Sequence, residues 1–311
     1  MPAPLERHAK GYRIPGTGIH LDPLEPVMHA VISHAHGDHA APGHEHAYCS
    51  EGTAALIRKR FTYPARHLHA IPYGEVFELN GVPFSFHPAG HILGSSQIRW
   101  EHAGKIHVYT GDFKREADPT CEAFEPVRCD VLITETTFAA RDKVHPDAAG
   151  IIASIPLPEK ANLMIGAYSL GKAQRITRLL NDHIPGIRVM IHPNMHDYHK
   201  VYEQMGFQLG PWEPFRRELF RQERGIAYLV PPPTLLNYRK GTHFIRAFAT
   251  GWDEKHELYD FALPVSDHAD WPSLIRTILE SGAREIYTIH GDGQELHDAE
   301  ELSGLSFSFI D

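Results

Sequence analysis

Cysteine is scarce in this sequence. Three residues occur in 311, Cys49, Cys121 and Cys129, and no two of them form a CxxC pair. This excludes a disulfide framework, and we expect three reduced, structural thiols. Long hydrophobic runs are also missing, since no segment approaches the roughly 20 apolar residues that span a bilayer. The start, MPAPLERHAKGYRIPG, lacks the basic-then-apolar pattern of a secretory signal, so we expect a cytoplasmic protein with no membrane contact.

Positive charge is in deficit as well. Thirty Lys and Arg residues face 39 Asp and Glu residues, which gives a formal net charge of −9. That balance argues against a protein that coats nucleic acid by bulk electrostatics. It leaves open an enzyme with a locally positive groove or with bound dications. The 24 histidines favour metal chemistry.

The rhythm of apolar runs changes along the chain. Before about residue 140, four runs predict short strands that end in polar clusters: HAVISH (29–34), GVPFSFHPAGH (81–91), GKIHVYTGDF (104–113) and CDVLITETTF (129–138). A helix is predicted over 51–61. From about 150, longer strand–helix alternation indicates an α/β region with a mainly parallel sheet.

Chemistry-bearing turns lie on both sides of this α/β region. Residues 259–292 read as strand, polar turn, helix and strand, and the last strand ends at a histidine. We therefore predict one catalytic domain, formed by 1–145 and 251–311, and an inserted domain at 146–250.

The segment VISHAHGDHAAPGHEH (31–46) holds the strongest chemical signal. His34 and His36 point to the same side of an extended strand because side chains alternate with period two. Past the strand end, Asp38 and His39 can turn toward a second position. Such an H-x-H-x-D-H cluster can serve two adjacent metal ions. Surface histidines in a His-rich protein are the alternative, which the spacing after an apolar run disfavours.

Two metals need further ligands, and two strand ends offer them. FSFHPAGHILGSS contains His87 and His91, and the small residues around His91 favour it as the ligand. HVYTGDF contains Asp112, whose carboxylate could bridge both ions. Each alone is as well explained as an ordinary turn residue; with the first cluster they complete a pattern.

The ordered motifs resemble the metallo-β-lactamase superfamily, and within it the nucleic-acid-processing β-CASP branch, over nearly the whole chain. The matching motifs are GIHLD, SHAHGDH, AGHILGS, YTGDF, TETTF, AYSLGKAQ, ATGW, VSDHADW and TIHGD. SDHADW, GKAQR and DPTCEAFEPVRCD look closer still to bacterial DNA-ligase-associated exonucleases. The resemblance implies an α/β fold class: an αββα metallo-β-lactamase sandwich with an inserted β-CASP-like domain.

The resemblance also implies a ligand set for two divalent metal ions. The first metal would be held by His34, His36 and His91, the second by Asp38, His39 and His290, and Asp112 would bridge them. Asp22 would fix the ligand loop by hydrogen bonding. Zinc suits these donors, although manganese or iron could occupy them.

Three side chains would carry the chemistry of phosphodiester hydrolysis. Two dications can bind a phosphate oxygen and lower the pKa of a shared water, which then attacks the phosphorus. Asp38 would orient that water. His268 would protonate the leaving oxygen, and Glu135 would hold its imidazole.

Substrate contacts are less sharply marked. Ser169 and Lys172 begin a helix after a strand, where a phosphate could bind. Trp252 could stack on a base, and Lys114 could meet a phosphate at the rim of the site. Each also suits an ordinary surface or packing role.

The leading hypothesis is a nuclease that acts on DNA, an exonuclease working with a DNA ligase and a helicase in repair. RNA processing in the manner of RNase J is the second hypothesis, and His290 keeps it open, because Artemis-like DNA nucleases typically lack a histidine there. A small-molecule ester or thioester hydrolase would share the H-x-H-x-D-H cluster without needing the insert. A decayed, non-catalytic scaffold is disfavoured by the complete ligand set.

Overall fold

The computed structural model describes residues 3–8, 11–62, 67–156, 161–238, 244–252, 259–291 and 293–310. The chain divides into two compact units, one formed by Met1–Val144 with His268–Asp311 and the other by His145–Asp267. The sequence placed the second boundary near 250. The second unit extends further because β17 (Phe261–Pro264) pairs in parallel with β16 (Phe244–Thr250) in its sheet.

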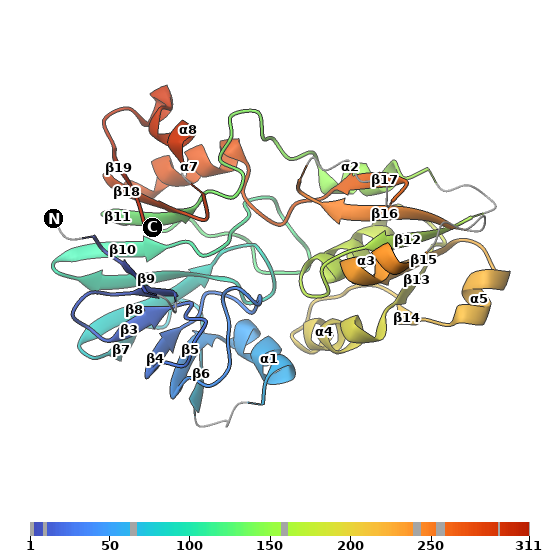
Figure 1. The fold of residues 1–311 in the computed structure, drawn as a ribbon, viewed down its shortest axis with the longest axis horizontal. Coiled ribbons are helices and arrows are strands. Elements are labelled where there is room, and N and C mark those ends of the chain that lie inside the picture. The colour runs from blue at the N-terminus through green and yellow to red at the C-terminus, as the bar shows by residue number, and fades with distance from the viewer. Residues whose placement is uncertain are drawn as a thin grey trace. The chain divides into compact units, whose positions relative to one another are not determined.

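Two sheets build the first unit (Figure 1). The six-stranded sheet has the order β1 (Glu6–His8), β2 (Gly11–Arg13), β3 (Ile19–Leu21), β4 (His29–Val31), β5 (His46–Ser50) and β6 (Leu68–Ile71). The seven-stranded sheet has the order β19 (Ser306–Phe309), β18 (Glu285–Ile289), β11 (Val131–Glu135), β10 (Lys105–Tyr109), β9 (Ser96–His102), β8 (Val82–Pro88) and β7 (Phe77–Leu79).

The two sheets pack face to face over one apolar core. Leu21 and Val31 from the first sheet meet Phe84, Trp100 and Ile133 from the second, and all five are at most 1% exposed. Burial of such side chains contributes about 1.5–3 kcal/mol each. Helix α1 (Glu51–Arg60) contacts β5 and β6 of the first sheet. The second sheet packs on α7 (Trp271–Ser281), α8 (Gln294–His297) and the 3₁₀ helix η2 (Glu300–Leu302). The predicted αββα sandwich is confirmed.

Helix α7 shows how local sequence sets an element's ends. Asp270 caps its first turn by accepting a hydrogen bond from the backbone N–H of Ser273, and Pro272 fits that turn because it needs no N–H there. Gly282 ends the helix in the left-handed conformation, at φ 68°. This fixes the polar turn before the helix, which carries His268.

The second unit is built on one parallel sheet (Figure 1). Its order is β14 (Glu213–Pro214), β13 (Arg188–Ile191), β15 (Ile226–Val230), β12 (Asn162–Gly166), β16 and β17. One face packs on α2 (Ala148–Ala153), α3 (Lys172–His183) and α4 (Pro193–Gln204), and the other on α5 (Arg217–Gln222) and α6 (Pro232–Asn237). Because both faces are covered, the strands are continuously apolar rather than alternating. The mainly parallel α/β sheet predicted here is present.

Five strand ends position the polar residues of the first unit. Strands β10, β11 and β18 run parallel to one another, and β8 runs in the same direction because antiparallel β9 lies between it and β10. Their carboxyl ends therefore meet at one edge of the sheet. The segment after β4 comes to the same edge, where the backbone N–H of Ser96 donates to the carbonyl of Ser33 over 2.9 Å.

The three cysteines are free and buried, as expected. Among the described ranges, we find no helix with both the length and the apolar character that crossing a bilayer requires.

Candidate metal centre

Asp22 is the hub that holds the segment after β4. Its carboxylate accepts a hydrogen bond from the Ser33 backbone N–H over 2.7 Å and from the Ser33 hydroxyl over 2.6 Å. It also accepts from Nδ1 of His39 over 2.8 Å and from the Tyr109 hydroxyl over 2.9 Å. Asp22 is 4% exposed and adopts φ 45°, a conformation that a non-glycine residue keeps only where its surroundings enforce it. Asp22 therefore joins Ser33, His39 and Tyr109 in one buried hydrogen-bond network, and its role in orienting metal ligands stays a prediction.

These hydrogen bonds decide which histidine nitrogens are left to bind a cation. Since the Ser33 hydroxyl donates to Asp22, it accepts from Nδ1 of His34, at 3.0 Å. Nδ1 of His39 is likewise engaged by Asp22, and its Nε2 is buried without a hydrogen-bond partner among the described residues. Such orientation of one ring nitrogen by an acceptor is typical of metal-binding histidines.

Three imidazoles and one carboxylate converge in the first donor group. Nδ1 of His36 lies 3.1 Å from Nε2 of His34 and 3.0 Å from Nε2 of His91. Oδ2 of Asp112 lies 3.5 Å from the His34 nitrogen and 3.8 Å from the His91 nitrogen. Ligands of a tetrahedral zinc ion stand about 3.4 Å apart, given Zn–N bonds near 2.1 Å. His87, the weaker candidate, instead contacts Ser85 and lies outside this group.

The second donor group shares Asp112 and adds His39 and His290, with ligand atoms within 4.8 Å of one another. Nε2 of His39 lies 3.4 Å from Oδ2 of Asp112, and its ring stacks on that of His290 at 5.3 Å. His290 adopts φ 58°, which turns it back at the end of β18. Asp38 stands further off, with its carboxylate 4.0 Å from Nε2 of His39 and its side chain 73% exposed.

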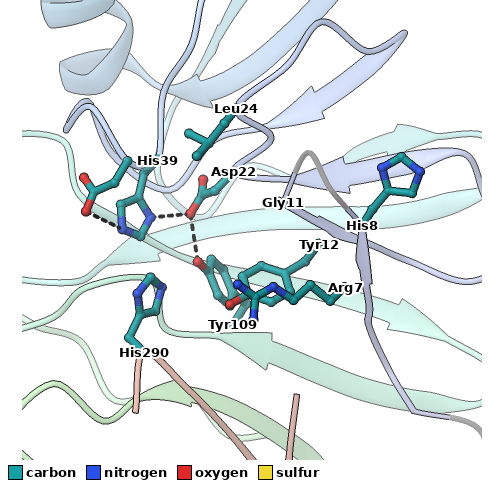
Figure 2. A pocket seen from close by; sticks show the side chains of 10 residues that line it. Arg7, His8, Gly11, Tyr12, Asp22, Leu24, His39, Tyr109 and His290 are labelled. Carbon is teal, nitrogen blue, oxygen red and sulfur yellow. Dashed lines mark hydrogen bonds and ion pairs between the residues drawn. The ribbon is translucent and has the colours of Figure 1, made fainter. Parts of the chain in front are cut away.

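His39 and His290 of the second donor group line a cleft of about 650 Å³ (Figure 2). The residues that line it come from β1 and β2, from the segments after β3 and β4, and from the ends of β10 and β18: Arg7, His8, Gly11, Tyr12, Asp22, Leu24, Asp38, His39, Tyr109 and His290.

Burial and charge set the protonation of these groups. Burial lowers the pKa of His34 well below its usual value, which keeps that imidazole neutral as a metal ligand must be. Although burial acts the other way, the positive charge of His39 holds the pKa of Asp112 well below its usual range. Burial also opposes a charge on His39, but the carboxylates of Asp112 and Asp22 raise its pKa. The negative charge of the Asp112 carboxylate thus favours a cation among the five imidazoles of the two donor groups.

Taken together, the donor set fits divalent metal ions. The buried Nε2 of His39 has no hydrogen-bond partner within the described part of the chain, and the ligand atoms around His36 stand at about the separation that a small cation imposes. Gly111, at φ 55°, lets the Asp112 turn approach, because a Cβ there would lie 2.8 Å from Cβ of Ser33.

Asp112 also belongs to a third group, with Glu135 and His268. Glu135 is 1% exposed, and its oxygens accept from the backbone N–H of Phe113 over 2.8 Å and from the Thr137 hydroxyl over 2.5 Å. Oε2 of Glu135 also bonds Nδ1 of His268 over 2.8 Å. These bonds already satisfy the Glu135 oxygens, so the group suits a positioned histidine–carboxylate pair better than a third metal.

Replacing Asp22 by asparagine is expected to weaken metal binding by about 10–100-fold, because removing the partner that orients a ligand histidine typically costs that much. Titration of the apo protein with Zn²⁺ against a competing chelator measures the change. Tyr109→Phe removes one donor to Asp22 and leaves its carboxylate, so it should give a smaller loss. Unaltered affinity in a folded Asp22→Asn protein would contradict the role of Asp22.

The four predicted substrate contacts divide between the two units. Lys114 is 2% exposed, and its Nζ lies 2.5 Å from Oδ2 of Asp118, so its charge is engaged below the surface rather than at a rim. Lys172, Ser169 and Trp252 belong to the second unit. Nζ of Lys172 is buried and donates to the Val265 carbonyl over 2.6 Å.

Ser169 and Trp252 are more accessible. Ser169 is half-buried, and its carbonyl accepts from the Gln174 side chain; Trp252 is 52% exposed. Sequence reasoning missed three supporting residues, Ser33, Tyr109 and Thr137. Their hydroxyls carry no pattern of their own, and their partners are apparent only in the fold.

Comparison with known proteins agrees with this geometry. The profile of a beta-lactamase superfamily domain matches residues 7–204. A protein of *Opitutus terrae* named "Probable DNA ligase" is 32% identical over 96% of this chain, which covers 30% of that protein. "Endoribonuclease YSH1" of *Yarrowia lipolytica* is 29% identical over 43% of this chain and 16% of its own length. "Cleavage and polyadenylation specificity factor 73" of *Drosophila melanogaster* is 31% identical over 37% and 18%.

The chain thus spans less than a third of the length of each of these relatives. A crystal structure of a protein of unknown function from *Enterococcus faecalis* V583 shares the fold, with a TM-score of 0.62 and 13% identity, over 91% of this chain and 79% of that one. The resemblance seen in the motifs is confirmed: this chain belongs to the beta-lactamase superfamily, in its β-CASP branch.

Proposed function

We propose that the protein is a two-metal-dependent nuclease, a DNA exonuclease that works beside a DNA ligase and a helicase in repair. The observation that carries the proposal is the position of Asp112, whose carboxylate belongs at once to both histidine groups and to the Glu135–His268 pair. The same carboxylate therefore adjoins the donor groups for two cations and a proton donor. Phosphodiester hydrolysis by two metal ions requires these groups.

In this proposal His34, His36, His91 and Asp112 hold one ion, and His39, His290, Asp112 and Asp38 hold the other. The ions, zinc by preference, would supply Lewis acidity at the phosphate. Asp38 would have to swing inward, which its 73% exposure allows. With Nδ1 bonded to Glu135, the proton that His268 can give to a leaving oxygen is the one on Nε2.

Coverage favours DNA over RNA as the substrate. The relative named for a DNA ligase matches 96% of this chain, whereas the relatives named for RNA cleavage match 37–43% of it. In the *Opitutus* protein the matching region covers 30% of a longer chain named as a ligase. The presence of this region in a protein named as a ligase supports a functional association between strand cleavage and DNA ligation. The parallel α/β unit at 145–267 would be the β-CASP-like insert.

Matched end-labelled single-stranded DNA and RNA, incubated with protein loaded with Zn²⁺ or Mn²⁺, test the proposal. We expect stepwise loss of nucleotides from DNA, with direction given by the label. Cleavage of RNA alone would place the protein among RNA-processing enzymes. If neither is cleaved by a protein with bound metal verified, the nuclease assignment is wrong, and activity on a thioester would then identify a small-molecule hydrolase.

A further inference from the structure

The cleft beside the second donor group has a wall that the proposed chemistry does not use. Arg7, His8, Gly11 and Tyr12 of the strands β1 and β2 line it together with His39 and His290. Figure 2 shows Arg7 and Tyr12 reaching into this cleft from the N-terminal strands. At about 650 Å³ the cleft lies within the 300–1,000 Å³ that small ligands occupy, which is enough for the nucleotide next to a bond held at the metal centre.

The register of the hairpin aims Arg7 at this cleft. Arg7 lies directly opposite Tyr12 in the antiparallel pair β1–β2, so the two side chains share one face. Glu6 and Arg13 form the adjacent pair and point to the other face, where Arg13 bonds Glu6 over 2.6 Å. The hairpin therefore sends one arginine toward the metal centre and engages the other in a surface ion pair.

The Arg7 side chain brings positive charge to the lining of the cleft. Among the described residues that line the cleft, Arg7 is the one arginine or lysine, and the carboxylates that line it are Asp22 and Asp38. A polyanion that approaches a protein of net charge −9 gains little from the overall field. Burial raises the pKa of Tyr12, and the positive charge of the Arg7 guanidinium opposes that rise. Arg7 is exposed and presents a fork that matches phosphate oxygens.

We propose that Arg7, supported by Tyr12, binds a phosphate of the substrate that neighbours the bond being cleaved. The inference rests on the proposed nuclease function and adds a specificity-determining subsite to it. The phosphate is either the diester one nucleotide away or a phosphate at the strand end.

Binding to the metal-free protein in EDTA gives a first readout that needs no activity. The affinity for a labelled single-stranded oligonucleotide is measured against salt by fluorescence anisotropy. One lost phosphate contact should reduce the slope of log K against log salt by about 0.7 in Arg7→Ala, and the affinity should fall about 10-fold. Arg13→Ala is the matched control, since it removes the same charge from the other face of the same hairpin.

Cleavage of substrates with one neutral methylphosphonate identifies the phosphate. The wild-type protein should lose about 10-fold in kcat/KM when the neutral linkage occupies the Arg7 subsite, and Arg7→Ala should be indifferent to it there. A strand-end phosphate is tested by comparing phosphorylated with hydroxyl ends. Arg7→Lys keeps the charge but not the fork and should recover part of the loss.

The two failures can be told apart. If the wild-type protein with bound metal cleaves no phosphodiester, the nuclease proposal fails. If it cleaves, but Arg7→Ala matches Arg13→Ala in salt slope and in methylphosphonate profile, the nuclease proposal stands and the Arg7 subsite is wrong.

Discussion

Alanine in place of His268 is expected to lower kcat on single-stranded DNA by about 10²–10⁴-fold, the usual cost of removing a positioned general acid. His268 lies outside the two histidine groups, and its Nδ1 is fixed by Glu135 over 2.8 Å. The metal content should therefore stay unchanged, which elemental analysis of the purified variant would check. Single-turnover rates at saturating DNA measure the loss.

A leaving group that needs no proton separates acid catalysis from a structural role. On an ester that releases p-nitrophenolate, the His268→Ala protein should lose much less activity than on DNA, because that anion departs unaided. His183→Ala, which removes an exposed histidine at the end of α3, serves as the control and should behave as wild type. An equal loss on both substrates would show that His268 is not the proton donor.

Asparagine in place of Asp112 is expected to cost still more. This residue belongs to all three donor groups. Its carboxylate also stabilises the protonated form of His39, which burial disfavours. Losing it should reduce bound metal from two ions to one or none per chain. It should lower kcat/KM by about 10³-fold or more, since the cations supply several kcal/mol of transition-state stabilisation. Metal stoichiometry and kcat/KM are the two measurements.

Asp118→Asn is the matched control for Asp112→Asn. Asp118 is a buried carboxylate of the same loop, but its partner is Lys114 rather than a histidine group. Breaking either buried pair should destabilise the protein, by about 3–5 kcal/mol. Only Asp112→Asn should lose metal from the folded fraction. Two ions retained by folded Asp112→Asn would rule out the bridging role.

Much of the fold could be predicted because its signals are local. The run HAVISH gives β4, and the caps around WPSLIRTILES give α7, with Asp270 before it and Gly282 after it. The apolar strands of the second unit indicated a parallel sheet with both faces covered. The boundary near 250 could not be placed, because β17 joins that sheet through pairing with β16 and not through its own composition.

The predicted substrate contacts show where local reasoning stops. A lysine next to GDF or at a helix start has the same appearance whether its charge reaches solvent or not. In the fold, Lys114 and Lys172 are drawn into buried ion pairs with Asp118 and Asp267. Arg7, in contrast, lies in a polar hairpin with no motif of its own. It is a candidate for substrate binding only because β1 and β2 border the cleft.

What the sequence determined by itself is which side chains stand at the ends of the strands. Residue type and the end of an apolar run place His34, His36 and Asp112 there without any knowledge of distant contacts. The expected strand through His34 and His36 is not formed, because β4 ends at Val31 and both histidines lie in the segment that follows it, so alternation along a strand does not bring them together. Their roles as ligands stay predictions until metal is measured. What only the tertiary structure decided is which atoms meet, because Tyr109 and Asp22 are 87 positions apart and His268 and Glu135 are 133 apart. Hydrogen bonds between residues far apart in the sequence engage Nδ1 of His39 and Nδ1 of His268, and no local pattern encodes them.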